Sequence, residues 1–225
     1  MTTRRVPATV LIGAIAVVAV GVTSAVIAWR ASSASIDAGF WWDDAAPFIL
    51  SADDALKIGG PVTTDELTRL QQISRAEVHR AYAGLRINVT EDRGAFWRVA
   101  VVGTPLTTTR NRLTFPFSAA GESRIFGPLG GSGSVAFMIL AHNAIEHAPD
   151  GAARAQMIDG IGRGIGRAAV HELAHQALGL ENLAYIDNRT DENSYEYGNA
   201  DRPAQYYGDV RWTTAWPVLK EKFGR

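Results

Sequence analysis

The sequence predicts an α+β domain that follows an N-terminal transmembrane helix. Three observations carry this prediction. An uncharged apolar run covers residues 6–29, residues 85–90 alternate apolar and polar side chains as a strand does, and residues 167–179 combine helix-forming side chains with a terminal glycine. The 225 residues are 47% hydrophobic and 20% charged, which is typical of one folded domain with a hydrophobic core.

The apolar run at residues 6–29 is long enough to cross a bilayer as a helix, which takes about 20 apolar residues. Arg4 and Arg5 precede it and only Arg30 follows directly, so the positive-inside rule places the N-terminus in the cytoplasm. We expect a cytoplasmic stub and transmembrane signal anchor at residues 1–30, a tether at 31–39 and the folded domain at 40–225. The protein is then a single-pass membrane protein with an extracytoplasmic domain.

A cleaved signal peptide is the alternative for this segment, because small residues precede Ala25 and Ala34 as they do at cleavage sites. In that case the protein is secreted. The apolar run exceeds the usual signal-peptide core of about 7–15 residues, which favours the anchor.

The middle of the chain predicts one helix and three strands. A helix begins at Thr63 or Thr64, with acidic residues in its first turn, and ends before Gly84. Strands are expected at residues 85–90, 96–102 and 134–140, and the first two either form a hairpin or lie apart in one sheet. The aromatic residues at 40–42 are expected to pack onto the domain.

The motif His171-Glu172-Leu-Ala-His175 carries the chemistry. On a helix, residues four apart share a face, so both imidazoles can reach one metal ion. Two imidazoles suit Zn²⁺, and Glu172 then lies where it can take a proton from a water molecule at the metal. The chain has no cysteine, so any metal must use His and carboxylate ligands. The net charge of −1 gives no support for a nucleic-acid partner.

Other histidines and the glycine row before the motif need separate interpretations. His142 and His147 lie five apart, a spacing that does not put both on one helix face, and we expect them to be structural. Glycines recur at every second position from 160 to 166 and reduce helix stability. Close packing of the helix against a neighbour, or a loose first turn, would explain them.

The five residues of this motif resemble the zincin superfamily of zinc metallopeptidases. The expected order of elements, with strands before the motif helix, is similar to the N-terminal part of zincins. The resemblance implies a zincin-like domain in which a small mixed sheet backs the active-site helix and an edge strand aligns an extended substrate.

Catalytic zinc sites usually have three protein ligands, and no His follows His175. Glu196 is our preferred third ligand, because a carboxylate on a second short helix, here expected at residues 190–198, resembles the gluzincin group of zincins. Glu181 and Glu192 are the alternatives; Glu181 has the spacing of the metzincin ligand, but with Glu in place of His and a displaced glycine. In gluzincins an acid shortly after the ligand orients a zinc-bound His, a role that Asp201 would take.

We therefore expect a membrane-anchored, exported zinc-dependent peptidase that acts on a peptide or protein substrate. His171, His175 and Glu196 hold Zn²⁺, and Glu172 is the general base that activates the water. Metal-assisted hydrolysis of a non-peptide bond would use the same residues. The rival from another class is a non-catalytic exported domain that binds a metal or a partner on a zincin-like fold. The sequence carries no signal for the oligomeric state or the cleavage preference.

Overall fold

The computed structural model describes residues 34–44, 47–103, 107–110, 113–116, 120–126, 129–179 and 184–225. The apolar segment expected to span the membrane lies outside these residues. Within them, no helix combines the length and the apolar character that crossing a bilayer requires. The compact unit begins at Ile36 with the first strand, so residues 36–39 belong to the domain and not to the expected tether.

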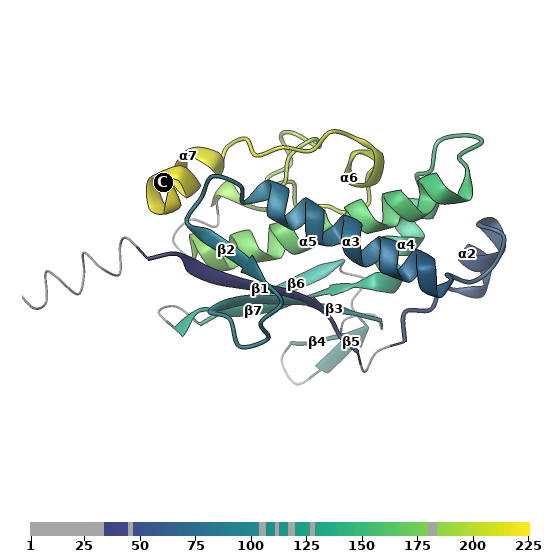
Figure 1. Ribbon diagram of the computed structural model, residues 1–225, viewed down its shortest axis with the longest axis horizontal. Coiled ribbons are helices and arrows are strands. Elements are labelled where there is room, and N and C mark those ends of the chain that lie inside the picture. Colours follow the sequence, from purple (N-terminus) through teal and green to yellow (C-terminus); the bar gives the residue numbers. More distant parts are fainter. Residues whose placement is uncertain are drawn as a thin grey trace, which may run out of the picture. The chain divides into compact units, whose positions relative to one another are not determined.

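The domain is α+β, as predicted, and is built on a five-stranded mixed sheet in the order β2-β1-β3-β7-β6 (Figure 1). Strands β2, β1, β3 and β7 run parallel to one another, and β6 is antiparallel to β7 at one edge. The strands are β1 (Ile36–Trp42), β2 (Ile87–Thr90), β3 (Trp97–Val102), β6 (Gly121–Ile125) and β7 (Gly131–Ala136).

A separate two-stranded sheet pairs β4 (Thr107–Arg110) with β5 (Leu113–Pro116). In the main sheet β1 lies between β2 and β3, so the two strands expected at 85–90 and 96–102 lie apart and do not form a hairpin. Phe40 and Trp42 are buried in β1, which confirms that the aromatic cluster packs onto the domain.

The strand predicted at residues 134–140 is wrong in its second half. Strand β7 ends at Ala136, and α4 (Phe137–Glu146) begins at the next residue. A continuous apolar run fits a buried strand and a buried helix equally well. The residues that α4 buries are spaced as on one helix face: Phe137, Leu140, Ala141, Ala144 and Ile145.

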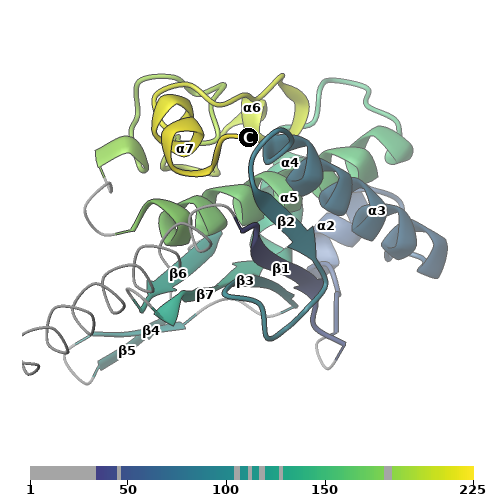
Figure 2. The same cartoon turned by 60° about the vertical axis from the view of Figure 1, so that its left-hand side comes forward.

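Two long helices, α3 (Thr64–Ala81) and α5 (Arg154–Leu178), lie side by side on the same face of the sheet (Figures 1 and 2). The predicted start of α3 is confirmed, because Thr63 and Glu66 form a reciprocal capping box. Short helices complete the domain: α2 (Ala52–Lys57), α6 (Pro203–Tyr207) and α7 (Trp216–Phe223).

The glycines of α5 allow α3 to approach closely. A Cβ atom on Gly162 would lie 2.9 Å from the side chain of Ile73, and one on Gly166 would lie 2.7 Å from the carbonyl oxygen of Ser74. Both distances are shorter than ordinary contacts, so only glycine fits at this contact. Of the two explanations for the glycine row, close helix packing is the one that the structure bears out.

Candidate metal centre

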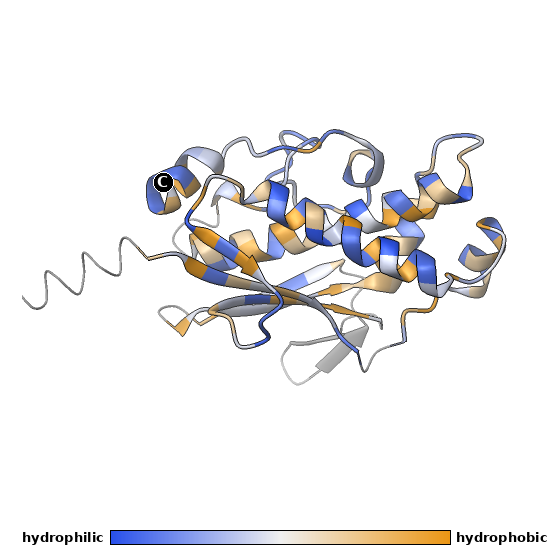
Figure 3. Ribbon diagram, in the orientation of Figure 1, coloured by the Kyte–Doolittle hydropathy of each residue, from blue (hydrophilic) through white to orange (hydrophobic). Residues whose placement is uncertain are grey.

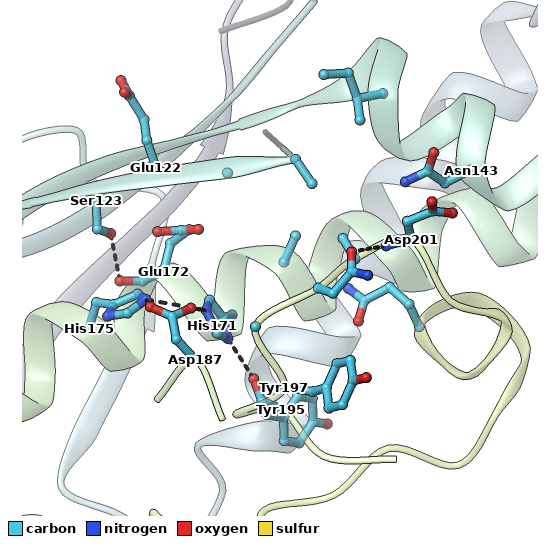
Figure 4. A pocket seen from close by; sticks show the side chains of 18 of the residues that line it. Glu122, Ser123, Asn143, His171, Glu172, His175, Asp187, Tyr195, Tyr197 and Asp201 are labelled. Carbon is cyan, nitrogen blue, oxygen red and sulfur yellow. Dashed lines mark hydrogen bonds and ion pairs between the residues drawn. The ribbon is translucent and has the colours of Figure 1, made fainter. Parts of the chain in front are cut away.

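The C-terminal half of α5 presents both motif histidines from one face. Helix α5 ends at Leu178, and Gly179 caps it with a positive φ of 73° that glycine tolerates. The Nε2 atoms of His171 and His175 lie 3.2 Å apart. The two side chains therefore point to one place, as their four-residue spacing predicts (Figure 4).

Asp187 is the acid that completes this cluster. Its Oδ1 lies 3.1 Å from Nε2 of His171, and its Oδ2 lies 3.5 Å from Nε2 of His175. Ligands held at about 2.0–2.1 Å around a tetrahedral zinc ion are separated by about 3.3 Å. Two imidazole nitrogens and a carboxylate at these separations form a donor set that fits zinc.

The loop that carries Asp187 is held in an uncommon backbone conformation. Asp187 has a φ of 63°, a left-handed value that Asp tolerates better than most residues. A Cβ atom on Gly198 would lie 2.8 Å from the Asp187 Cα, so glycine is needed there. The Gly198 N–H donates to the carbonyl of Asn188 at 2.9 Å. Neighbouring backbone therefore fixes the point from which the carboxylate reaches the histidines.

The orientation of the His171 ring is set by its other nitrogen. Its Nδ1–H donates to the backbone carbonyl of Tyr195 at 2.8 Å, which leaves Nε2 as the atom that faces His175 and Asp187 and could bind a metal. The Tyr195 hydroxyl donates to Glu77 on α3 at 3.1 Å, and Arg167, one turn before His171, donates to the same oxygen at 2.9 Å. This buried network links α3, α5 and the loop that carries the Tyr195 carbonyl.

Glu172 lies next to the edge strand β6. Its side chain is buried, and a Cβ atom on Gly121 would lie 2.9 Å from both Cγ and Cδ of Glu172. Ser123 in the same strand donates from its hydroxyl to the Glu172 backbone carbonyl at 2.8 Å. Strand β6 therefore limits where the acid can lie relative to the histidines.

Burial and charge shift the pKa values of this cluster in different directions. Burial raises the pKa of Glu172, although the two histidines partly oppose this. Hydrogen bonds to His171 and His175 hold the pKa of Asp187 well below its usual range. Burial works to lower the pKa of His171, but the bond to Asp187 and the charge of Glu172 outweigh it, so this pKa is raised. Asp187 is thus a carboxylate, and Glu172 has a stronger tendency to accept a proton.

The histidines open into a groove of about 590 Å³. Strand β6, helices α4 and α5 and the loop at residues 195–201 line it. Two further acids, Glu122 and Asp201, lie along it, and no lysine or arginine is among the described residues that line it. Its described charged lining residues are therefore acids and the two histidines.

Comparison with known protein families, curated proteins and solved structures found no match for this chain.

The structure does not bring Glu196 to the histidines, which corrects the preferred third ligand. Residues 190–198 form turns and not the expected helix. The Glu196 carboxylate is fully buried, and one of its oxygens accepts hydrogen bonds from the backbone N–H groups of Thr213 and Ala215, each at 2.8 Å. Its function is to hold the C-terminal segment. Glu192 is exposed and outside the cluster, and Glu181 lies outside the described residues.

Asp201, His147 and His142 form ion pairs away from the His171–His175 cluster. The Asp201 carboxylate pairs with Nε2 of His147 at 2.8 Å, so the orienting role expected of it belongs to the Tyr195 carbonyl. His142 pairs with Asp54 at 3.0 Å. The sequence did not single out Asp187, because the one feature that points to it is its position a few residues after Gly179, where the motif helix ends.

Proposed function

We propose that this chain is a membrane-anchored, exported zinc-dependent peptidase of zincin-like type. His171, His175 and Asp187 hold the zinc ion, and Glu172 is the general base. The observation that carries the proposal is the cluster of three donor atoms, 3.1–3.5 Å apart, beside a buried carboxylate on the same helix. The donor chemistry and these separations match a zinc site with a position left for water.

When bound, zinc lowers the pKa of a water molecule and polarises the substrate carbonyl. Glu172 accepts the proton that the attacking water loses, and it delivers that proton to the amine as the C–N bond breaks. A base is most effective when its pKa is near the working pH, and burial moves the Glu172 pKa in that direction. The Tyr195 carbonyl holds the His171 ring in the tautomer that the site needs.

A peptide substrate is supported by the position of the groove at the sheet edge. Among the strands that the structure describes, β6 pairs only with β7, so its other edge can accept an extended peptide as an added strand. The groove favours substrates with basic residues, because Glu122 lies along it with only a distant Arg124 at 3.9 Å, and no lysine or arginine is among the described residues that line it. The apolar run at residues 6–29 supports anchorage in the membrane, or secretion if that run is cleaved.

The test is to measure bound metal and peptide cleavage on the same preparations. We expect about one zinc per chain in the parent protein, lost in His171→Ala. Glu172→Gln should retain zinc and lose cleavage of a library of basic peptides. A protein that binds no zinc, or a Glu172→Gln variant that cleaves as fast as the parent, would refute the proposal. Zinc binding without cleavage of any peptide would favour the non-catalytic rival.

A further inference from the structure

Three large apolar side chains are exposed together at the turn between β6 and β7. Phe96, Phe126 and Leu129 expose 41%, 45% and 78% of their surface. They are adjacent, because Leu129 N–H donates to the Phe126 carbonyl at 3.2 Å and Gly131 N–H donates to the Phe96 carbonyl at 3.0 Å. We call these three residues the apolar tip. Contiguous exposed apolar residues of this kind usually mark a contact surface.

The apolar tip lies at the end of the sheet where the domain begins. In the register Ala38 of β1 lies beside Trp97 of β3, and Val99 of β3 lies beside Gly133 of β7. The first residues of β1, β3 and β7 therefore share one end of the sheet with the tip. Figure 1 shows this end on the left, and the turn there is coloured as hydrophobic in Figure 3.

Chain length keeps this end close to the membrane. If residues 6–29 span the bilayer, only residues 30–35 connect them to β1. An extended chain covers at most about 3.6 Å per residue, so six residues reach roughly 20 Å. The start of β1, at the end of the sheet that carries the tip, is then held within that distance of the bilayer surface.

Basic residues lie at the same end of the sheet as the tip. Arg124, two residues before Phe126, exposes 70% of its side chain. The backbone N–H of Ile36 donates to the Arg86 carbonyl at 3.0 Å, and the guanidinium of Arg225 donates to the Leu85 carbonyl at 3.3 Å, which places both arginines near the start of β1. The Arg86 guanidinium donates to the carbonyls of Gly224 and Lys222, so Arg124 is the arginine best placed to reach lipid phosphate groups beside the apolar tip.

We propose that the apolar tip inserts into the outer leaflet of the bilayer in which the chain is anchored. The inference rests on the anchored form of the proposed function, and it adds a second contact between the domain and the lipid. Three side chains alone would bind a membrane weakly. The tether removes this difficulty, because a short linker makes the second contact intramolecular, with an effective concentration of about millimolar.

The absence of cysteine from the chain allows a direct test with single spin labels. The full-length protein is reconstituted in vesicles with equal amounts of phosphatidylcholine and phosphatidylglycerol, and a nitroxide is attached to Leu129→Cys. Its collisions with oxygen, which concentrates in lipid, are compared with those of a water-soluble nickel complex. Leu56→Cys is the matched control, because Leu56 is 81% exposed on α2, at the other end of the domain in Figure 1.

We expect the label on Leu129→Cys to favour oxygen several-fold over the label on Leu56→Cys. Equal, water-like values at both positions would overturn the inference, and so would shielding from both reagents, which would indicate a protein partner or a second copy. A third label on Val17→Cys reports on the anchor itself. If that label is also in water, anchorage fails together with the tip inference, while zinc binding and cleavage are measured independently.

Discussion

The substitution Gly121→Ala tests the placement of Glu172, the proposed base, without changing a proposed metal ligand. A methyl group at Gly121 would lie 2.9 Å from Cγ and Cδ of Glu172, whereas carbon atoms pack at about 3.5–4.0 Å. The carboxylate must therefore move by roughly 1 Å. A misplacement of this size costs about 100-fold in rate, or about 2.7 kcal/mol of transition-state stabilisation. We expect kcat to fall by that factor while zinc affinity stays at the parent value.

The assay compares kcat, KM and zinc affinity of Gly121→Ala with those of Gly131→Ala. The control has the same chemical change in the neighbouring strand, and its methyl group meets the side chain of Gln176, one turn beyond Glu172. Gly131→Ala should lower stability but leave kcat within a few-fold of the parent. A Gly121→Ala enzyme as fast as the parent would show that Glu172 does not act from the position that the structure gives it. Loss of zinc in Gly121→Ala would show that the change acts on the metal and not on the base.

Three further outcomes follow from individual contacts. Asp187→Asn should weaken zinc binding by at least about tenfold. Glu196→Gln should leave zinc affinity unchanged and lower the free energy of unfolding by about 1–3 kcal/mol, because buried backbone donors lose a charged acceptor. Metal titration and urea unfolding distinguish the two variants, and the reverse pattern would indicate that Glu196 is the ligand. Hydrogen bonds from Arg154 lower the pKa of Glu66 to about 2, from an ordinary value of 4.5, so this pair stabilises the fold above about pH 4.5 and its contribution disappears as the pH falls towards 2. The urea midpoint should therefore fall less steeply with pH in Glu66→Gln than in the parent protein. Equal pH dependence of the two midpoints would contradict a stabilising role of this pair. Gly166→Ala should destabilise the protein by about 1–3 kcal/mol despite the better helix propensity of Ala, because the added methyl meets the backbone of α3; a rise in the melting temperature would mean that the helices can separate at no cost.

Local signals predicted the parts of the fold that depend on neighbouring residues. The capping box at Thr63 and Glu66, the helix stop at Gly179 and the pairing of His171 with His175 were all readable because each involves residues within one helical turn. The edge position of β6 was not readable, since strand order depends on contacts between distant segments.

The third group of the site escaped prediction for a related reason. The pattern around Glu196 favours a helix start, but tertiary contacts with residues 213–215 hold that segment in turns. Asp187 has no periodic pattern around it, and its position depends on a left-handed backbone and on close approach to Gly198. Neither feature has a sequence signature as specific as the histidine spacing.

Strand β6 joins two properties that are usually separate. At Gly121 it lies against Glu172 and limits where that side chain can reach, and its other edge pairs with none of the described strands. A substrate peptide that paired with this edge would convert β6 from an edge strand into an interior strand and stiffen its backbone at Gly121. Glu172 would then be held most firmly when a substrate is bound, so that substrate binding would itself improve the position of the carboxylate.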